Sequence, residues 1–106
     1  MGDREAGRER LDEIAPAFLA RPDVAFGRMF NSDGLAVRGK LFAFAANDGS
    51  LVVKLPEDRI GELGLDNIVM RGRPMREWAK VPFTDDAERW RSIADEAHAF
   101  VDSITP

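Results

Sequence analysis

Basic side chains are concentrated in residues 69–81 of a chain whose net charge is −4. The segment reads VMRGRPMREWAKV, and its basic residues are Arg71, Arg73, Arg76 and Lys80. The run RGRP at 71–74 matches the core of an AT-hook, an extended element whose arginines enter the narrow minor groove of A·T-rich DNA. Apolar residues flank this run on both sides, so we expect an ordered turn leading into a strand rather than a flexible hook.

The strand that follows this turn could present an aromatic side chain between two cations. Side chains alternate along a strand, so Arg76, Trp78 and Lys80 should share one face. A tryptophan in this setting can stack on a nucleobase while its basic neighbours contact phosphates. Alternatively, Trp78 packs beneath a helix, and the stems of the two basic residues lie over its rim. The candidate residues for contact with nucleic acid or another partner are Arg71, Arg73, Arg76, Trp78 and Lys80.

Few residues are suited to catalysis. His98 is the single histidine and the chain has no cysteine, so the nitrogen and sulfur ligands of a metal site are scarce. His98 falls beside the apolar stripe of the last predicted helix, which favours a place at the boundary of the core. Asp85 and Asp86 are adjacent and suit the start of the same helix. We therefore expect no catalytic residue, no metal site and no cofactor.

Two short runs share oxygen-rich letters with calcium loops. Neither NSDG (31–34) nor NDGS (47–50) continues into the spaced acids and distal glutamate of an EF-hand loop. Both runs are more typical of hairpin turns. The glycines also fail to form a phosphate-binding motif.

Composition limits the classes of protein that this chain could belong to. With 106 residues it is long enough for one domain, and 44% hydrophobic residues can supply a packed core. An acidic pI near 5.0 means that the overall field does not attract nucleic acid. The chain shows neither a secretory signal nor an apolar run of the ~20 residues that a membrane span needs. We expect a soluble cytoplasmic protein that does not engage a membrane.

Apolar periodicity predicts a long helix near each end of the chain. The first stripe consists of Leu11, Ile14, Ala15, Phe18 and Leu19, and its helix should end before Pro22. The second stripe consists of Trp90, Ile93, Ala94, Ala97, Val101 and Ile104, and either Thr84 or Asp85 should cap its helix. A short helix is expected to begin at Pro56 and end at Gly64.

The residues between the long helices predict antiparallel strands. Apolar runs cover residues 24–30, 35–37, 40–46 and 51–55, and a further strand is expected at 76–81. Turns are expected at NSDG, Arg38-Gly39 and NDGS. The predicted fold is therefore α+β: a single domain over residues 1–106, in which the N- and C-terminal helices pack on one face of an antiparallel strand meander, giving two layers.

Several blocks of this sequence resemble one protein family. The blocks are GRMFNSDGLAVRGKLFAFA, LVVKLPEDRIGEL, GRPMREW and AHAFV, and they run from about Gly27 to Val101. In order and spacing they are similar to the N-terminal domain of the TfoX/Sxy family, particularly its short stand-alone members, with MmcQ/YjbR-like proteins as more distant structural cousins. The resemblance implies an α+β fold with a curved antiparallel sheet. It implies no catalytic constellation.

The resemblance and the residues together suggest a non-enzymatic role. The named TfoX regulators promote natural competence and carry a second, C-terminal domain that we do not expect in this chain. We expect a small cytoplasmic domain with a regulatory or protein-interaction role, in which an exposed sheet edge could also join two copies into a homodimer. One alternative is a nucleic-acid-binding module that uses the 71–80 segment. Another is a small-ligand binder with a pocket between sheet and helices.

Overall fold

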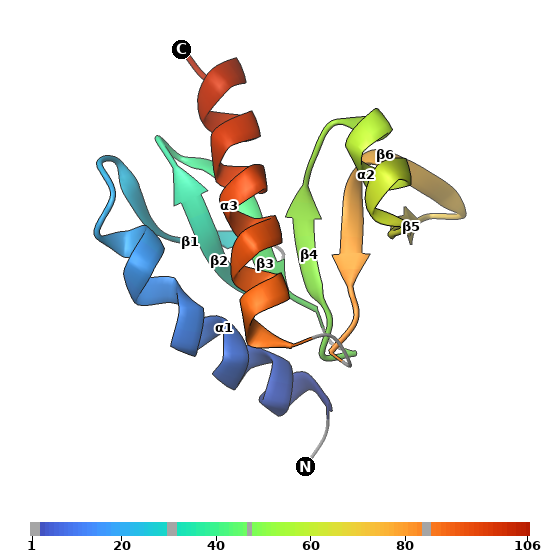
Figure 1. Cartoon of the computed structure of the whole chain (residues 1–106), viewed down its shortest axis with the longest axis horizontal. Coiled ribbons are helices and arrows are strands. Elements are labelled where there is room, and N and C mark those ends of the chain that lie inside the picture. Colours follow the sequence, from blue (N-terminus) through green and yellow to red (C-terminus); the bar gives the residue numbers. More distant parts are fainter. Residues whose placement is uncertain (1–2, 30–31, 47, 84–85) are drawn as a thin grey trace.

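The computed structural model describes residues 3–29, 32–46, 48–83 and 86–106. Within these residues the helices are α1 (Asp3–Leu19), α2 (Glu57–Leu63) and α3 (Ala87–Ile104). The strands are β1 (Val24–Met29), β2 (Ser32–Val37), β3 (Lys40–Ala45), β4 (Leu51–Lys54), β5 (Asp66–Met70) and β6 (Arg73–Val81). Figure 1 shows α1 and α3 lying across the same face of the sheet.

The strands form one antiparallel sheet with the order β1-β2-β3-β4-β6-β5. The first four strands are neighbours in sequence order, and the β5–β6 hairpin then adds to β4 through β6. This arrangement confirms the predicted α+β class, with an antiparallel sheet packed by the N- and C-terminal helices. The described strands therefore have two edges, at β1 and β5.

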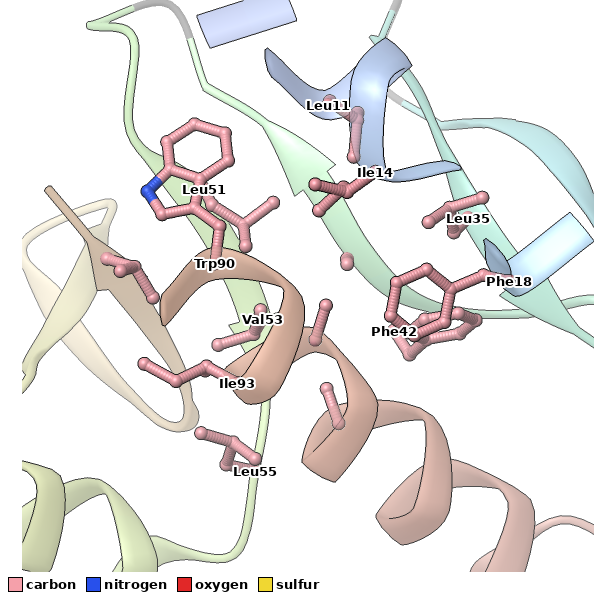
Figure 2. Packing of buried hydrophobic residues seen from close by; sticks show 14 of the residues in the cluster. Leu11, Ile14, Phe18, Leu35, Phe42, Leu51, Val53, Leu55, Trp90 and Ile93 are labelled. Atoms are coloured by element: carbon pink, nitrogen blue, oxygen red, sulfur yellow. The ribbon is translucent and has the colours of Figure 1, made fainter. Parts of the chain in front are cut away.

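The core lies between the sheet and the two long helices. Leu11, Ile14 and Phe18 of α1 meet Trp90 and Ile93 of α3 over the inward residues of β2, β3 and β4 (Figure 2). Trp90 is fully buried and its indole Nε1 donates a hydrogen bond to the Pro82 carbonyl at 3.1 Å. The helical stripes read from the sequence therefore supply nine of the 20 described residues of this core, and most of the others come from the strands.

The last residue of each predicted stripe does not reach the core. Leu19 is 36% exposed and Ile104 is 53% exposed, so their predicted burial is wrong. Both residues are the final residues of their helices. Periodicity assigns them to the apolar side of the helix, but there is no further turn of helix beyond them to hold that side against the sheet.

The helix ends follow local capping rules, with one change. Gly64 ends α2 in the left-handed conformation at φ 69°, as predicted, while Pro56 is the residue before the helix rather than its first residue. The α3 cap is Asp86, whose Oδ1 accepts a hydrogen bond from Arg89 N at 2.8 Å. Thr84 and Asp85, the predicted caps, lie outside the described residues.

The strands differ from the prediction at β2, β5 and β6, and β6 begins at Arg73 rather than at residue 76. β2 begins at Ser32, so the Ser-Asp-Gly part of the NSDG run pairs with β1 and is not a turn. Residues 30 and 31, which complete the predicted strand and turn, lie outside the described residues. β5 is a further strand that the sequence reading did not include. The Arg38-Gly39 hairpin turn is confirmed by positive φ angles of 48° and 82°.

Candidate binding face

The basic segment forms the second hairpin of the sheet. Arg71 and Gly72 have φ angles of 54° and 78°, as a two-residue type I′ turn requires, and they connect Met70 of β5 to its partner Arg73 of β6. The RGRP run is thus held in a tight turn and its following strand. The AT-hook alternative is wrong for this fold, because a hook must be extended along the DNA groove.

Alternation along β6 places Trp78 away from the helices. Ala79 and Val81 are fully buried in the core beneath the helices, so Trp78 and Lys80 point to the opposite face. We call this the helix-free face, because α1 and α3 pack against the opposite face of the sheet, although Glu57 of α2 and Ile104 of α3 line pockets that Trp78 also lines. The alternative in which Trp78 packs beneath a helix is therefore wrong. The predicted shared face of Arg76, Trp78 and Lys80 agrees with the strand geometry.

Two aromatic rings meet on the helix-free face. Phe44 of β3 and Trp78 of β6 have ring centroids 5.9 Å apart and planes inclined at 56°. β4 runs between them, with Val52 opposite Phe44 and Lys54 opposite Trp78. Val52 is only 2% exposed although it faces away from the helices. Val52 and the two rings therefore lie on the same face of the sheet.

Lys54 adds a positive charge to this aromatic pair. Its Nζ lies 5.6 Å from the centroid of the Trp78 indole, within range of a cation–π interaction. Lys54 forms no ion pair within the described part of the chain. Sequence reasoning missed both Lys54 and Phe44. Alternation along β3 and β4 predicts on which face of the sheet each of these two side chains lies. It does not predict which residue of the neighbouring strand lies opposite, because that depends on the register between segments distant in sequence.

The five predicted contact residues separate into three groups. Arg76 and Trp78 belong to the helix-free face beside Lys54. Arg71 and Arg73 are exposed at the hairpin end. Lys80 is paired with Asp48, at 3.3 Å between Nζ and Oδ2, so its charge is already balanced. Hydrogen bonds from Ser50 to the same carboxylate lower the pKa of Asp48, and Lys80 adds to this effect.

A groove runs beside the Trp78 indole. Its volume is about 540 Å³, and it is lined by Lys54, Glu57, Pro74, Met75, Arg76, Glu77 and Trp78. Its charges are mixed, with the Glu57 and Glu77 carboxylates beside the Lys54 and Arg76 cations. A phosphate backbone would meet repulsion here as well as attraction, whereas the mixed side chains of a protein surface could match both signs.

His98 has a structural environment. Arg21 Nη1 lies 3.2 Å from its Nδ1, and the imidazole packs edge-on against Phe42 with centroids 5.3 Å apart. Because an arginine can only donate, Nδ1 is the acceptor and the ring is neutral. Burial, followed by the nearby Arg21 charge, lowers the pKa of His98. The predicted position at the boundary of the core agrees with these contacts.

Metal ligands do not gather in the described residues. No group of three or more histidine, aspartate or glutamate side chains there is arranged to hold an ion. Asp86 is used as a helix cap. None of the described helices combines the length and the apolar character needed to cross a membrane.

Comparison with known proteins gives no further information about this site. The chain matches no family model, no curated protein and no solved structure.

Proposed function

We propose that this chain is a small non-enzymatic binding domain that contacts another protein through its helix-free face. The observation that carries the proposal is the Phe44–Trp78 pair, which lies on the sheet face opposite to α1 and α3. Tryptophan and arginine are the side chains that most often dominate the energy of a protein interface. Trp78 and Arg76 lie together on this face, at the wall of one groove.

The charges of the groove favour a protein partner. An incoming segment would place an apolar side chain on the Trp78 indole and meet Lys54 and Arg76 with acidic groups. Glu57, at the border of this face, would accept basic or amide groups from the same segment. We place this role in the cytoplasm and give it the regulatory character that the resemblance to the TfoX/Sxy N-terminal domain implies.

Affinity capture with matched variants tests the proposal. Arg76→Glu and Trp78→Ser change the helix-free face, whereas Arg91→Glu makes the same charge change as Arg76→Glu on an exposed position of α3. We expect at least one protein from the source cells that is retained by the wild type and by Arg91→Glu, and is lost with both face variants. Purified, that protein should bind the wild type in isothermal titration. Equal capture by all four forms would contradict the proposal.

The β5 edge offers a separate surface, through which two copies of the chain would pair. β5 is an edge strand, and its Val69 is 67% exposed, so strand addition at this edge would bury an apolar side chain. Sedimentation equilibrium would then report a dimer, and Val69→Lys would return it to a monomer. A monomer at all concentrations would exclude self-association at this edge and would leave the proposal for the helix-free face unchanged.

Single-stranded nucleic acid is the second candidate ligand. The observation that favours it is the cluster of Trp78, Lys54 and Arg76, in which an indole that could stack on a base lies beside two cations without ion pairs in the described residues. Fluorescence anisotropy with a labelled oligonucleotide of mixed sequence at low salt tests it. Binding should weaken steeply with salt and disappear in Trp78→Ser. No binding at low salt would remove this candidate.

A further inference from the structure

The sheet opens between β3 and β4 at one end. These strands pair only through Ala43↔Val53, Phe44↔Val52 and Ala45↔Leu51. Near the start of β3 the register with β2 shifts: Leu35 pairs with Ala43 and Ala36 pairs with Leu41, so Phe42 has no partner on β2. Such a β-bulge bends the strand that contains the extra residue. The chain after β4 instead stays with β6, where Leu55 N donates to the Glu77 carbonyl at 2.9 Å. The two halves of the sheet therefore separate here.

A cavity of about 310 Å³ occupies this opening. Its apolar walls come from Leu41 of β3, Trp78 of β6, and Val101 and Ile104 of α3. Ile104, which is 53% exposed, therefore lies in the wall of this cavity. The volume lies near the lower end of the range for ligand pockets, which suits a small molecule.

The charged side chains lining this cavity are both cations. Lys40 and Lys54 line it, and neither forms an ion pair within the described residues. Thr105 and Pro106 also line it, and their oxygens already accept hydrogen bonds from Arg38 at 2.7 and 3.3 Å. A second, larger cavity of about 410 Å³ differs in charge. Its Lys80 is paired with Asp48, and Asp66 also lines it, so acidic groups balance the lysine there.

We propose that this cavity binds a small organic anion with an apolar body, such as an aromatic or short aliphatic carboxylate or sulfonate. The apolar part would lie against Leu41, Trp78 and Ile104, and the anionic group would lie between Lys40 and Lys54. Burial of the apolar part supplies most of the affinity, while the two lysines select an anion over a neutral molecule. This site goes beyond the proposed protein interface, although Lys54 and Trp78 line both.

A pair of fluorescent probes tests the proposal. Anilinonaphthalene sulfonate has an aromatic body and an anionic group, and phenylnaphthylamine is its neutral counterpart. We expect saturable binding of the sulfonate with one molecule per chain and clearly weaker binding of the amine. Amide shifts in nuclear magnetic resonance spectra should be concentrated at Leu41, Lys54, Trp78 and Ile104.

Three charge variants and one cavity variant identify the site. Lys40→Gln and Lys54→Gln should each raise the dissociation constant of the sulfonate by about two- to fivefold, the effect of losing one exposed charge pair. Arg91→Gln removes the same charge from a distant position on α3 and should leave the constant unchanged. Ile104→Asp, at an exposed position, should abolish binding while the protein stays folded by circular dichroism. Absence of one-to-one binding, equal affinity for the amine, equal effects of all three charge variants, or shifts confined to other residues would overturn the proposal.

Discussion

The two tryptophans of the chain occupy opposite faces of the sheet and have different roles. Trp90 is fully buried, donates a hydrogen bond to Pro82 and packs against Phe83. Trp78 is partly exposed and touches Phe44 and Lys54. In the sequence both residues stand next to charged residues, so the immediate neighbours do not distinguish a core tryptophan from a surface one. The direction of the side chain from β6 makes that distinction at position 78.

This difference predicts unequal costs of truncation. Trp90→Ala should lower the free energy of unfolding by about 3–5 kcal/mol, as for other fully buried aromatic residues. Trp78→Ala should cost less than about 2 kcal/mol, because less apolar area leaves water there. Urea unfolding followed by circular dichroism measures both. A cost at position 78 as large as that at position 90 would contradict the assignment of Trp78 to the helix-free face.

His98 predicts a dependence of stability on pH. Its neutral ring accepts a hydrogen bond from Arg21, while Asp95, Asp102 and Arg38 are the other charges around it. Because folding lowers its pKa below the unfolded value of 6.5, the unfolded chain binds the proton more tightly. His98 therefore stabilises the fold fully above that value, and its contribution is lost as pH falls toward the lower folded pKa.

The variant His98→Gln isolates this effect from the titration of carboxylates. We expect the free energy of unfolding to fall less in the variant than in the wild type between about pH 7.5 and about pH 5. Urea titrations at the two pH values give the comparison. Identical falls in both proteins would show that His98 titrates alike in the folded and unfolded chain.

At the scale of elements, the β5–β6 turn holds an arginine in a strained conformation. Arg71 has φ 54°, a region that asparagine and glycine adopt more readily. Arg71→Asn should therefore raise the free energy of unfolding by about 0.5–1 kcal/mol, and Gly72→Ala, at φ 78°, should lower it by about 1 kcal/mol. Arg73→Asn, in the strand, is the control and should give no gain. Thermal unfolding that ranks these variants otherwise would contradict the turn type.

Two helical glycines give a matched test of how α1 meets the sheet. A Cβ added at Gly7 would lie 2.5 Å from the Gly49 carbonyl oxygen, whereas one added at Gly61 meets no atom within 4 Å. Gly61→Ala should stabilise the protein by up to about 1 kcal/mol through helix propensity. Gly7→Ala should destabilise it, because the contact is with backbone. Stabilisation by both substitutions would mean that α1 does not approach the β3–β4 turn so closely.

The long helices and most strands could be predicted because their signals are local. The 3.6-residue spacing from Leu11 to Phe18 and from Trp90 to Val101 gives the buried stripes directly. β5 is not predicted because DNIVM has no regular alternation. The turn at Arg71-Gly72 is predicted only as the entry to one strand, so the hairpin is not recognised. The Arg38-Gly39 turn has the same two letters, and its flanking apolar runs made it recognisable.

At the scale of the whole molecule, the candidate face depends on pairings that the sequence does not display. Trp78 lies opposite Lys54, and the two rings meet across β4, only because β6 inserts between β4 and β5. A basic segment read along the chain gives Arg76, Trp78 and Lys80. In the structure, Lys80 is paired with Asp48, and the residues beside Trp78 are Lys54 and Phe44 from the neighbouring strands.

Site-specific photo-crosslinking in living cells tests the helix-free face most directly. A benzoylphenylalanine at position 76 lies on this face, and one at position 91 lies on the exposed side of α3. The proposal predicts a discrete crosslinked species from position 76 that is absent from position 91 and disappears when Trp78→Ser is added. A species formed equally from both positions, or only from position 91, would contradict the claim that the face around Phe44 and Trp78 binds the partner.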